Sequence, residues 1–146
     1  MKKMFLAAIL LVALTSAAFA DGKKSSEKLF NDLKTALKSV NQSDWVTTAS
    51  FQKASFTLNG KEAHAYMNPD GNLVGFSIAI DKSALPEGTM ETLAKKYDGW
   101  QIINPIMFID ESGNTSYYVQ ANKDKQSLAL HVSDKGKVSI YGRIPF

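Results

Sequence analysis

One short pattern occurs twice in this chain, and it constrains the fold more than any other feature. Residues 66–74 read YMNPDGNLV and residues 131–139 read HVSDKGKVS. In each copy a strand-like stretch enters a polar turn with glycine at the same place, and a second strand-like stretch follows. A stretch closed by an acid and a tryptophan precedes each copy, at 43–45 and at 98–100. The pattern predicts a helix followed by strands, used twice.

Two stretches carry the apolar spacing of an amphipathic helix. The first runs from Ser26 to Val40 behind a polar lead-in at 21–25. The second has Pro86 in its first turn and Gly99 available as a left-handed cap at its end. Its apolar stripe is Met90, Leu93, Ala94 and Tyr97.

Six or seven segments alternate between apolar and polar residues, as antiparallel strands do. Asn59 and Gly60 are typical of a two-residue type I′ hairpin turn, and Pro105 predicts a bend or an edge position. The expected fold is α+β with two layers, a tandem αβββ repeat whose antiparallel sheet packs on two helices. Residues 21–146 form one domain, with halves at 25–81 and 82–146. The strands cover 53–58, 61–67, 74–80, 101–109, 115–121, 126–132 and 138–141.

The alternation also divides the strand residues between two faces of the sheet. The face toward the helices is predicted to carry Phe56, Leu58, Met67, Phe76, Ile78, Val119, Leu128, Leu130 and Val132. The open face is predicted to carry Lys53, Glu62, His64, Tyr66, Tyr118, Gln120, His131 and Tyr141.

The first 20 residues have the organisation of a signal peptide. Lys2 and Lys3 precede an apolar core at Phe5–Leu14, and a small-x-small cleavage site ends at Ala20. The mature protein is expected to begin at Asp21, to insert in no membrane, and to be periplasmic or secreted. Because the chain has no cysteine, it cannot carry a lipoprotein anchor, a disulfide or a thiol nucleophile.

The charge of the mature chain argues against nucleic acid as a partner. The whole chain has 17 Lys and Arg against 14 Asp and Glu, and removal of Lys2 and Lys3 leaves 15 against 14, a net charge of +1. A nucleic-acid binder normally shows a clustered basic face. Here the lysines are scattered, so no such partner is expected.

Several of these segments together resemble the PepSY-like proteins, small exported bacterial proteins also described as beta-lactamase-inhibitor-protein-like. The resemblance spans Trp45 to Ile140 and rests on the order of four pieces. It implies a tandem αβββ fold and a non-enzymatic role, binding or inhibiting another exported protein. The pieces are Asn59–Tyr66, Asp70–Gly75, Leu93–Ile102 and Ser116–Val119.

The candidate site is the open face. Aromatic residues on a solvent-facing sheet are enriched at protein interfaces, although cross-strand pairing alone also explains them. We expect an exported or envelope protein to contact this face, and we expect no enzyme activity and no cofactor. The predicted contact residues are Tyr66, Tyr118, His64 and His131, with Lys53 and Gln120 at the margin.

The alternative is a small-ligand or metal-ion binder that uses a pocket between sheet and helices. A metal site would combine His64 and His131 with Glu62 as the third ligand. The turns at 68–72 and 110–114 contain oxygen ligands around glycine, but neither has the length or the final glutamate of a calcium loop. Trp45 and Trp100, placed alike after the two helices, are interpreted as plugs between helix and sheet rather than as stacking platforms for a ligand.

Overall fold

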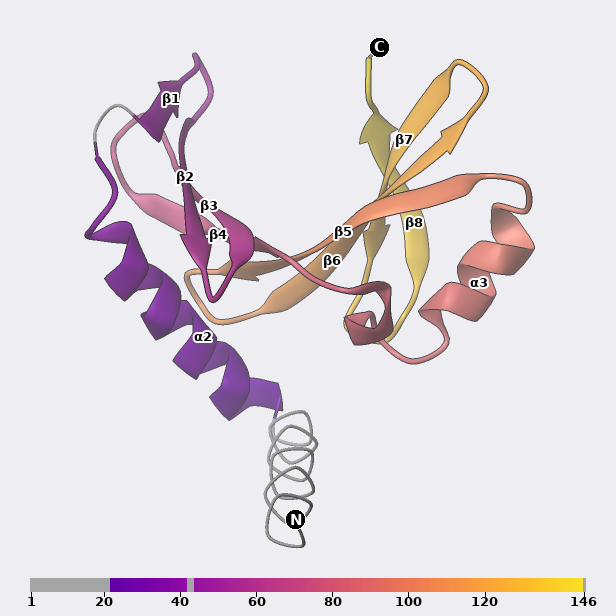
Figure 1. Cartoon of the computed structure of the whole chain (residues 1–146), viewed down its shortest axis with the longest axis horizontal. Coiled ribbons are helices and arrows are strands. Elements are labelled where there is room, and N and C mark those ends of the chain that lie inside the picture. Colours follow the sequence, from indigo (N-terminus) through magenta and orange to yellow (C-terminus); the bar gives the residue numbers. More distant parts are fainter. Residues whose placement is uncertain (1–21, 42–43, 146) are drawn as a thin grey trace, which may run out of the picture.

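A helix opens the part of the chain that the computed structural model describes, residues 22–41 and 44–145 (Figure 1). This helix, α2 (Gly22–Leu37), is already formed at Gly22, so the predicted polar lead-in is wrong for residues 22–25. Lysine and serine cost a helix little, and tertiary burial of an amphipathic face outweighs that cost. The helix ends where Val40 donates a tight-turn hydrogen bond to the Leu37 carbonyl. The predicted signal peptide lies outside the described residues.

Eight strands form one antiparallel sheet in which every strand pairs with its neighbour in sequence (Figure 1). The sheet has one strand more than the alternation predicted. The prediction missed β1, which is only three residues long and so too short to show an alternating pattern. Each helix is followed by four strands rather than the predicted three. The strands are β1 (Trp45–Thr47), β2 (Gln52–Leu58), β3 (Lys61–Met67), β4 (Leu73–Ala79), β5 (Gln101–Asp110), β6 (Thr115–Lys123), β7 (Gln126–Val132) and β8 (Val138–Arg143).

The second helix is shorter than its sequence pattern suggested. A 3-10 turn, η2 (Lys82–Ala84), is followed by α3 (Thr89–Lys96), which has eight residues against the 16 of α2. The prediction of Pro86 in the first helical turn is wrong, since left-handed Gly88 caps the helix after it. Gly99 does adopt a left-handed conformation beyond the helix end. Short α3 therefore covers less of the sheet than α2 does.

The turns explain the pattern that occurs twice in the sequence. Asn59 and Gly60 both have positive φ, as the type I′ hairpin requires. The turns at 68–72 and 133–137 share one arrangement of backbone hydrogen bonds, and the turn at 110–114 has it as well. In each turn the side-chain oxygen of the first residue also accepts a hydrogen bond from the backbone N–H four residues on. The repeated pattern is thus a hairpin geometry, present three times.

Strand β5 bends near its middle. The pairing register with β6 shifts between Ile103 and Ile106, and Asn104 has a φ of 52°. Proline cannot donate to the sheet, and the Pro105 carbonyl instead accepts a hydrogen bond from the N–H of Ile80. The predicted bend at Pro105 is confirmed.

Two apolar clusters form the core, one for each helix. In the α2 cluster, buried Leu33 of the helix meets Ala54 and Phe76 of the strands. In the α3 cluster, buried Leu93 meets Val119 and other strand residues. Figure 1 shows the two helices on the outer flanks of the sheet, while β1–β4 and β7–β8 rise on either side of the long β5 and β6.

Candidate functional site

The strand registers place all six predicted contact residues on one face of the sheet. Lys53 lies opposite Tyr66, and Tyr118 lies opposite His131. Neighbouring residues on these strands, such as Ala54 and Ala65, point the other way into the α2 cluster. We call the surface opposite the two apolar clusters the open face. Placement on it was predictable from alternation, and the role of these residues as contacts stays a prediction.

Tyr66 is the centre of a first aromatic cluster on the open face. Its ring lies 6.2 Å from that of Phe51, 6.4 Å from that of His64 and 6.1 Å from that of Phe108, measured between centroids. The phenol oxygen of Tyr66 lies 3.3 Å from the hydroxyl oxygen of buried Ser77. This hydrogen bond and the ring contacts hold Tyr66 against the sheet with its ring half-buried.

Gly75 makes room for the Phe108 ring in this cluster. Gly75 lies opposite Tyr66 in the sheet, and a β-carbon there would collide with the Phe108 ring and with the carbonyl oxygen of Ile109. A glycine inside a strand is often a place of close approach. Phe108 and Phe51 were missed by the sequence reasoning, and a glycine within an otherwise apolar strand was the signal that could have indicated the first of them.

His64 is held by two hydrogen bonds at the edge of the same cluster. Its Nδ1 lies 2.9 Å from the Ser55 hydroxyl and its Nε2 lies 3.1 Å from a Glu62 carboxylate oxygen. These partners suit a ring that donates from Nε2 and accepts at Nδ1. Burial, which leaves 20% of the side chain exposed, lowers the pKa of His64, and the positive charge of Lys53 lowers it further, against the opposing effect of Glu62.

A second aromatic cluster lies on β6, β7 and β8. The Tyr118 ring lies 5.2 Å from the His131 ring and 5.2 Å from the Tyr141 ring, with edge-to-face geometry in both pairs. Tyr141 is 72% exposed, so most of its ring faces solvent. Tyr118 and His131 are half-buried beneath it. A large exposed aromatic on a supported base is typical of an interface anchor.

Gln120 differs from the other candidates because its amide is fully engaged within the chain. Its oxygen accepts from the Asn104 amide, and its nitrogen donates to Asn122 and Ser127 at 3.0 and 2.9 Å. The Ser127 hydroxyl in turn donates to Asn122 at 2.6 Å. This network ties the bent part of β5 to β6 and β7, so the Gln120 amide is committed to hydrogen bonds within the sheet.

The two aromatic clusters are separate. Tyr66 on β3 and Tyr118 on β6 are three strand spacings apart, about 14 Å along a flat sheet. Within the described ranges no ring contact links one cluster to the other. His64 and His131 therefore do not converge as the metal hypothesis required.

The turn oxygens and acids offer no metal centre either. In residues 22–41 and 44–145 no group of three His, Cys, Asp or Glu side chains is close enough to hold an ion. Asp110 uses both carboxylate oxygens inside its own turn, accepting from the backbone of Ser112 and from the backbone and side chain of Asn114. These bonds are those of a hairpin turn.

The two tryptophans lie where the plug interpretation puts them. Trp45 packs against the α2 cluster and Trp100 against the α3 cluster. Trp100 also lines an open groove beside α3.

None of the helices in the described residues is long and apolar enough to cross a membrane.

Comparison with known proteins supports the fold. A BLIP-like protein from Bacteroides fragilis matches with a TM-score of 0.59 and 14% identity, over 89% of this chain and 86% of that one. A DUF2874 family protein from Bacteroides ovatus matches with a TM-score of 0.59 and 16% identity, over 75% and 83%. A Bacteroides eggerthii protein described as a putative periplasmic protein matches with a TM-score of 0.61 and 14% identity, over 77% of this chain and 83% of that one.

These likenesses define the class of protein as α+β with a BLIP-like fold. At such identities they show the fold alone. No family model matches the sequence, and no curated protein matches it. The beta-lactamase-inhibitor-like part of the predicted resemblance is thus supported, whereas the PepSY part is not.

Proposed function

We propose that this protein is an exported, non-enzymatic binding module that engages or inhibits another exported or envelope protein through its open face. The single observation that carries the proposal is the pair of aromatic clusters there. Tyr66 and Tyr118 are each supported by a histidine and by a second aromatic ring. Aromatic anchors on a firm base bury much area at low entropic cost, and protein interfaces use them for that reason.

The chemistry of the open face favours binding over catalysis. Among the described residues the close acid–imidazole pair is Glu62 with His64, and the other ring nitrogen contacts the Ser55 hydroxyl, so the residue types of a Ser–His–acid triad are present, but Ser55 is exposed. Glu62 is solvent-exposed, so it lies outside the water-excluding pocket that acid–base chemistry needs. We therefore assign the face to recognition.

The proposal includes two further points, namely that the protein is exported and that the chain arose by internal duplication. The predicted signal peptide and a structural neighbour described as a putative periplasmic protein both favour export. A helix followed by four strands, twice, favours an internal duplication. A partner in the same compartment is then expected.

The proposal is tested by affinity capture from the native envelope fraction, with the mature protein as bait and quantitative mass spectrometry as the measurement. Tyr141 and Ile140 are neighbours on β8 that are 72% and 61% exposed, and only Tyr141 contacts the second aromatic cluster. Tyr141→Ser should therefore lower capture of the partner at least tenfold, the loss of about 1.4 kcal/mol or more expected for an anchor.

The matched control is Ile140→Ser, which removes a large apolar side chain from the same strand but from the other side of the sheet. It should leave capture within about twofold of the unchanged protein. Equal capture by the Tyr141 variant and the unchanged protein, or equal loss in both variants, would contradict the proposal. Circular dichroism melts of both variants show that folding is not the cause.

A further inference from the structure

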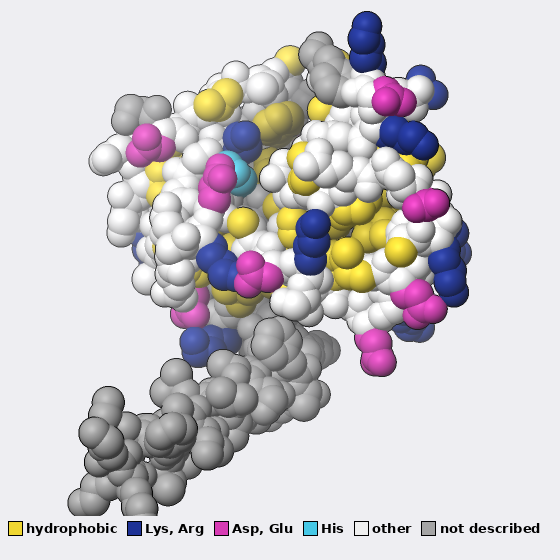
Figure 2. All heavy atoms as spheres, turned by 45° about the vertical axis from the view of Figure 1, so that its right-hand side comes forward, with side chains coloured by type: hydrophobic (Ala, Val, Ile, Leu, Met, Phe, Trp, Pro, Cys, Tyr) yellow, Lys and Arg dark blue, Asp and Glu magenta, His cyan; other side chains and the backbone are white. Residues whose placement is uncertain are grey.

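An apolar groove lies on the opposite side of the molecule from the open face, between α3 and the start of β5. Its volume is about 300 Å³. Figure 2, in which the side carrying α3 comes forward, shows hydrophobic side chains gathered in a hollow with charged side chains around it. The side chains that matter here are Lys82, Met90, Leu93, Tyr97, Trp100 and Ile102.

Part of the apolar stripe of α3 lines the groove and is exposed there, although its helical spacing is typical of a buried face. Met90, Leu93 and Tyr97 follow one another at helical spacing, yet Met90 is 41% exposed while Leu93 is buried. Large apolar residues lining a concave surface with a few polar groups are typical of ligand sites. The exposed end of the stripe is where a ligand would complete the packing.

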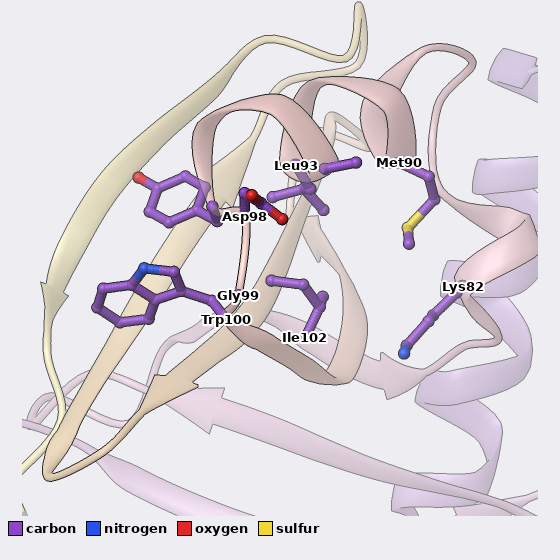
Figure 3. Close-up of a pocket in the computed structure, with 9 residues that line it drawn as sticks. Lys82, Met90, Leu93, Asp98, Gly99, Trp100 and Ile102 are labelled. Carbon is purple, nitrogen blue, oxygen red and sulfur yellow. The ribbon is translucent and has the colours of Figure 1, made fainter.

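The lining favours an aromatic ligand body. The rings of Tyr97 and Trp100 lie 5.9 Å apart with their planes at 90°, so they form an edge-to-face wall. In Figure 3 Met90 and Lys82 lie across the groove from Trp100, with Leu93 and Ile102 between. Thioether sulfur and aromatic edges both interact favourably with another aromatic ring.

The charges of Lys82 and Asp98 indicate which polar group the ligand should carry. Among the described residues Lys82 has no ion-pair partner, because the adjacent Asp81 carboxylate lies 3.8 Å from the Lys61 amine instead. The Lys82 side chain extends toward Ile102, and Asp98 lies well away from it (Figure 3). One carboxylate beside Lys82 would be favoured, whereas a second anionic group near Asp98 would be repelled.

We propose that this groove binds a small aromatic monocarboxylate, with the ring against Tyr97 and Trp100 and the carboxylate beside Lys82. The groove volume of about 300 Å³ lies at the lower end of the range for ligand sites, which suits a small ligand with one ring and a short side chain. An arylpropionate is such a ligand. The inference is independent of partner binding at the open face, since the two sites share no residue.

The test uses three probes of about the same size, namely 3-phenylpropionate, its neutral amide and 3-phenylpropylamine. Amide and indole N–H resonances of the protein are followed by NMR, and Trp45→Phe identifies the indole signal of Trp100. For a ligand this small we expect 3-phenylpropionate to bind with a Kd between about 0.1 and about 1 mM. Saturable shifts should be confined to the groove, with the acid tightest and the amine weakest.

Lys82→Gln should weaken the acid by roughly two- to fivefold, to the affinity of the amide, and leave the amide unchanged. Lys38→Gln, which removes an exposed lysine beyond the end of α2, is the matched control and should change neither. Met90→Glu places a carboxylate at the rim and should reverse the order of acid and amine.

Absence of saturable groove shifts up to about ten times the expected Kd would overturn the proposal. Equal affinity for acid and amide in the unchanged protein would do the same, and so would equal effects of the Lys82 and Lys38 variants. Both lysines are exposed, so both variants are expected to fold, and the dispersion of the same spectra checks this.

Discussion

The two halves of the molecule differ in the number of buried alanines that the sheet contributes to their cores. In the α2 cluster the sheet contributes a floor of three fully buried alanines, Ala54, Ala63 and Ala65, beside the larger Phe76, Ile78 and Ile109. In the α3 cluster the sheet contributes one buried alanine, Ala121, and in both clusters the helix contributes one fully buried leucine, Leu33 or Leu93. The buried strand residues of the α3 cluster also include Val119, Leu130, Val132 and Val138.

This difference follows from constant packing density. Interiors fill space to the same extent whatever the source of the atoms, so small strand residues require a long helix with large side chains above them. The strand residues of the α3 cluster include fewer alanines, and the helix above them has eight residues where α2 has 16. The cost of the shorter helix is an uncovered margin, and that margin is the groove beside Met90.

The largest effect is expected at the centre of the α2 cluster. Phe76 is fully buried, and its ring lies 5.3 Å from the Phe30 ring of α2 and 6.3 Å from the Phe56 ring. Phe76→Ala should lower the free energy of unfolding by about 3–5 kcal/mol, because the alanine floor offers nothing that can move into the cavity. Chemical denaturation measures it, and a loss below about 1.5 kcal/mol would mean that α2 does not seal this cluster.

A matched pair of leucines tests whether the two helices cover their clusters equally well. Leu33 of α2 and Leu93 of α3 are both buried, but only Leu93 also lines the groove. Leu33→Ala should cost near the upper end of the range of about 2–5 kcal/mol, and Leu93→Ala near the lower end. At Leu93 the groove wall can collapse or admit water. Equal losses in parallel denaturation curves would remove the distinction between the two cores.

Much of this architecture is readable from the sequence because it depends on local chemistry. Alternation assigned Lys53 and Tyr118 to the open face, and the register agrees, since a strand side chain has only two faces to choose from. The turn at Asn59 and Gly60 and the bend at Pro105 also follow from backbone preferences of single residues.

What the sequence did not predict depends on neighbours that only the fold supplies. Phe108 joins Tyr66 because two strand pairings bring them together across Gly75. Gln120 was placed at the margin of the site, but its amide is committed to a network that needs the bulge at Asn104. The exposure of Met90 could not be predicted either, because helical spacing does not say how far the sheet extends beneath a helix.

A pair of alanines separates a filled surface from an open one. Ala65 lies in the fully buried floor under α2, whereas Ala94 of α3 is exposed and lines the groove. Ala65→Leu should cost about 1–3 kcal/mol, because the added atoms force α2 away from the sheet. Ala94→Leu should change stability by less than about 0.5 kcal/mol, since its side chain enters open space. Similar costs for both would show that the groove is closed in solution.

The smallest expected effect is a pH dependence on the open face of the α2 half. Because burial and Lys53 lower the pKa of His64 in the folded protein, the unfolded chain binds more protons between the two pKa values. The titration of His64 does not change the free energy of unfolding above the unfolded pKa of about 6.5. As the pH falls from that value to the folded pKa, the free energy of unfolding decreases, and below the folded pKa the loss is complete.

NMR titration of the His64 ring measures the folded pKa directly, and two neighbouring charges sharpen the assignment. Lys53→Gln should raise this pKa, because a positive neighbour is removed, and Glu62→Gln should lower it, because the opposing carboxylate is removed. His64→Gln should lose less stability than the unchanged protein between about pH 8 and about pH 5. A ring that titrates at its ordinary value in the folded protein would mean that the open face is fully hydrated beside the first aromatic cluster. Tyr66 would then lack the dry support on which its proposed role as an anchor depends.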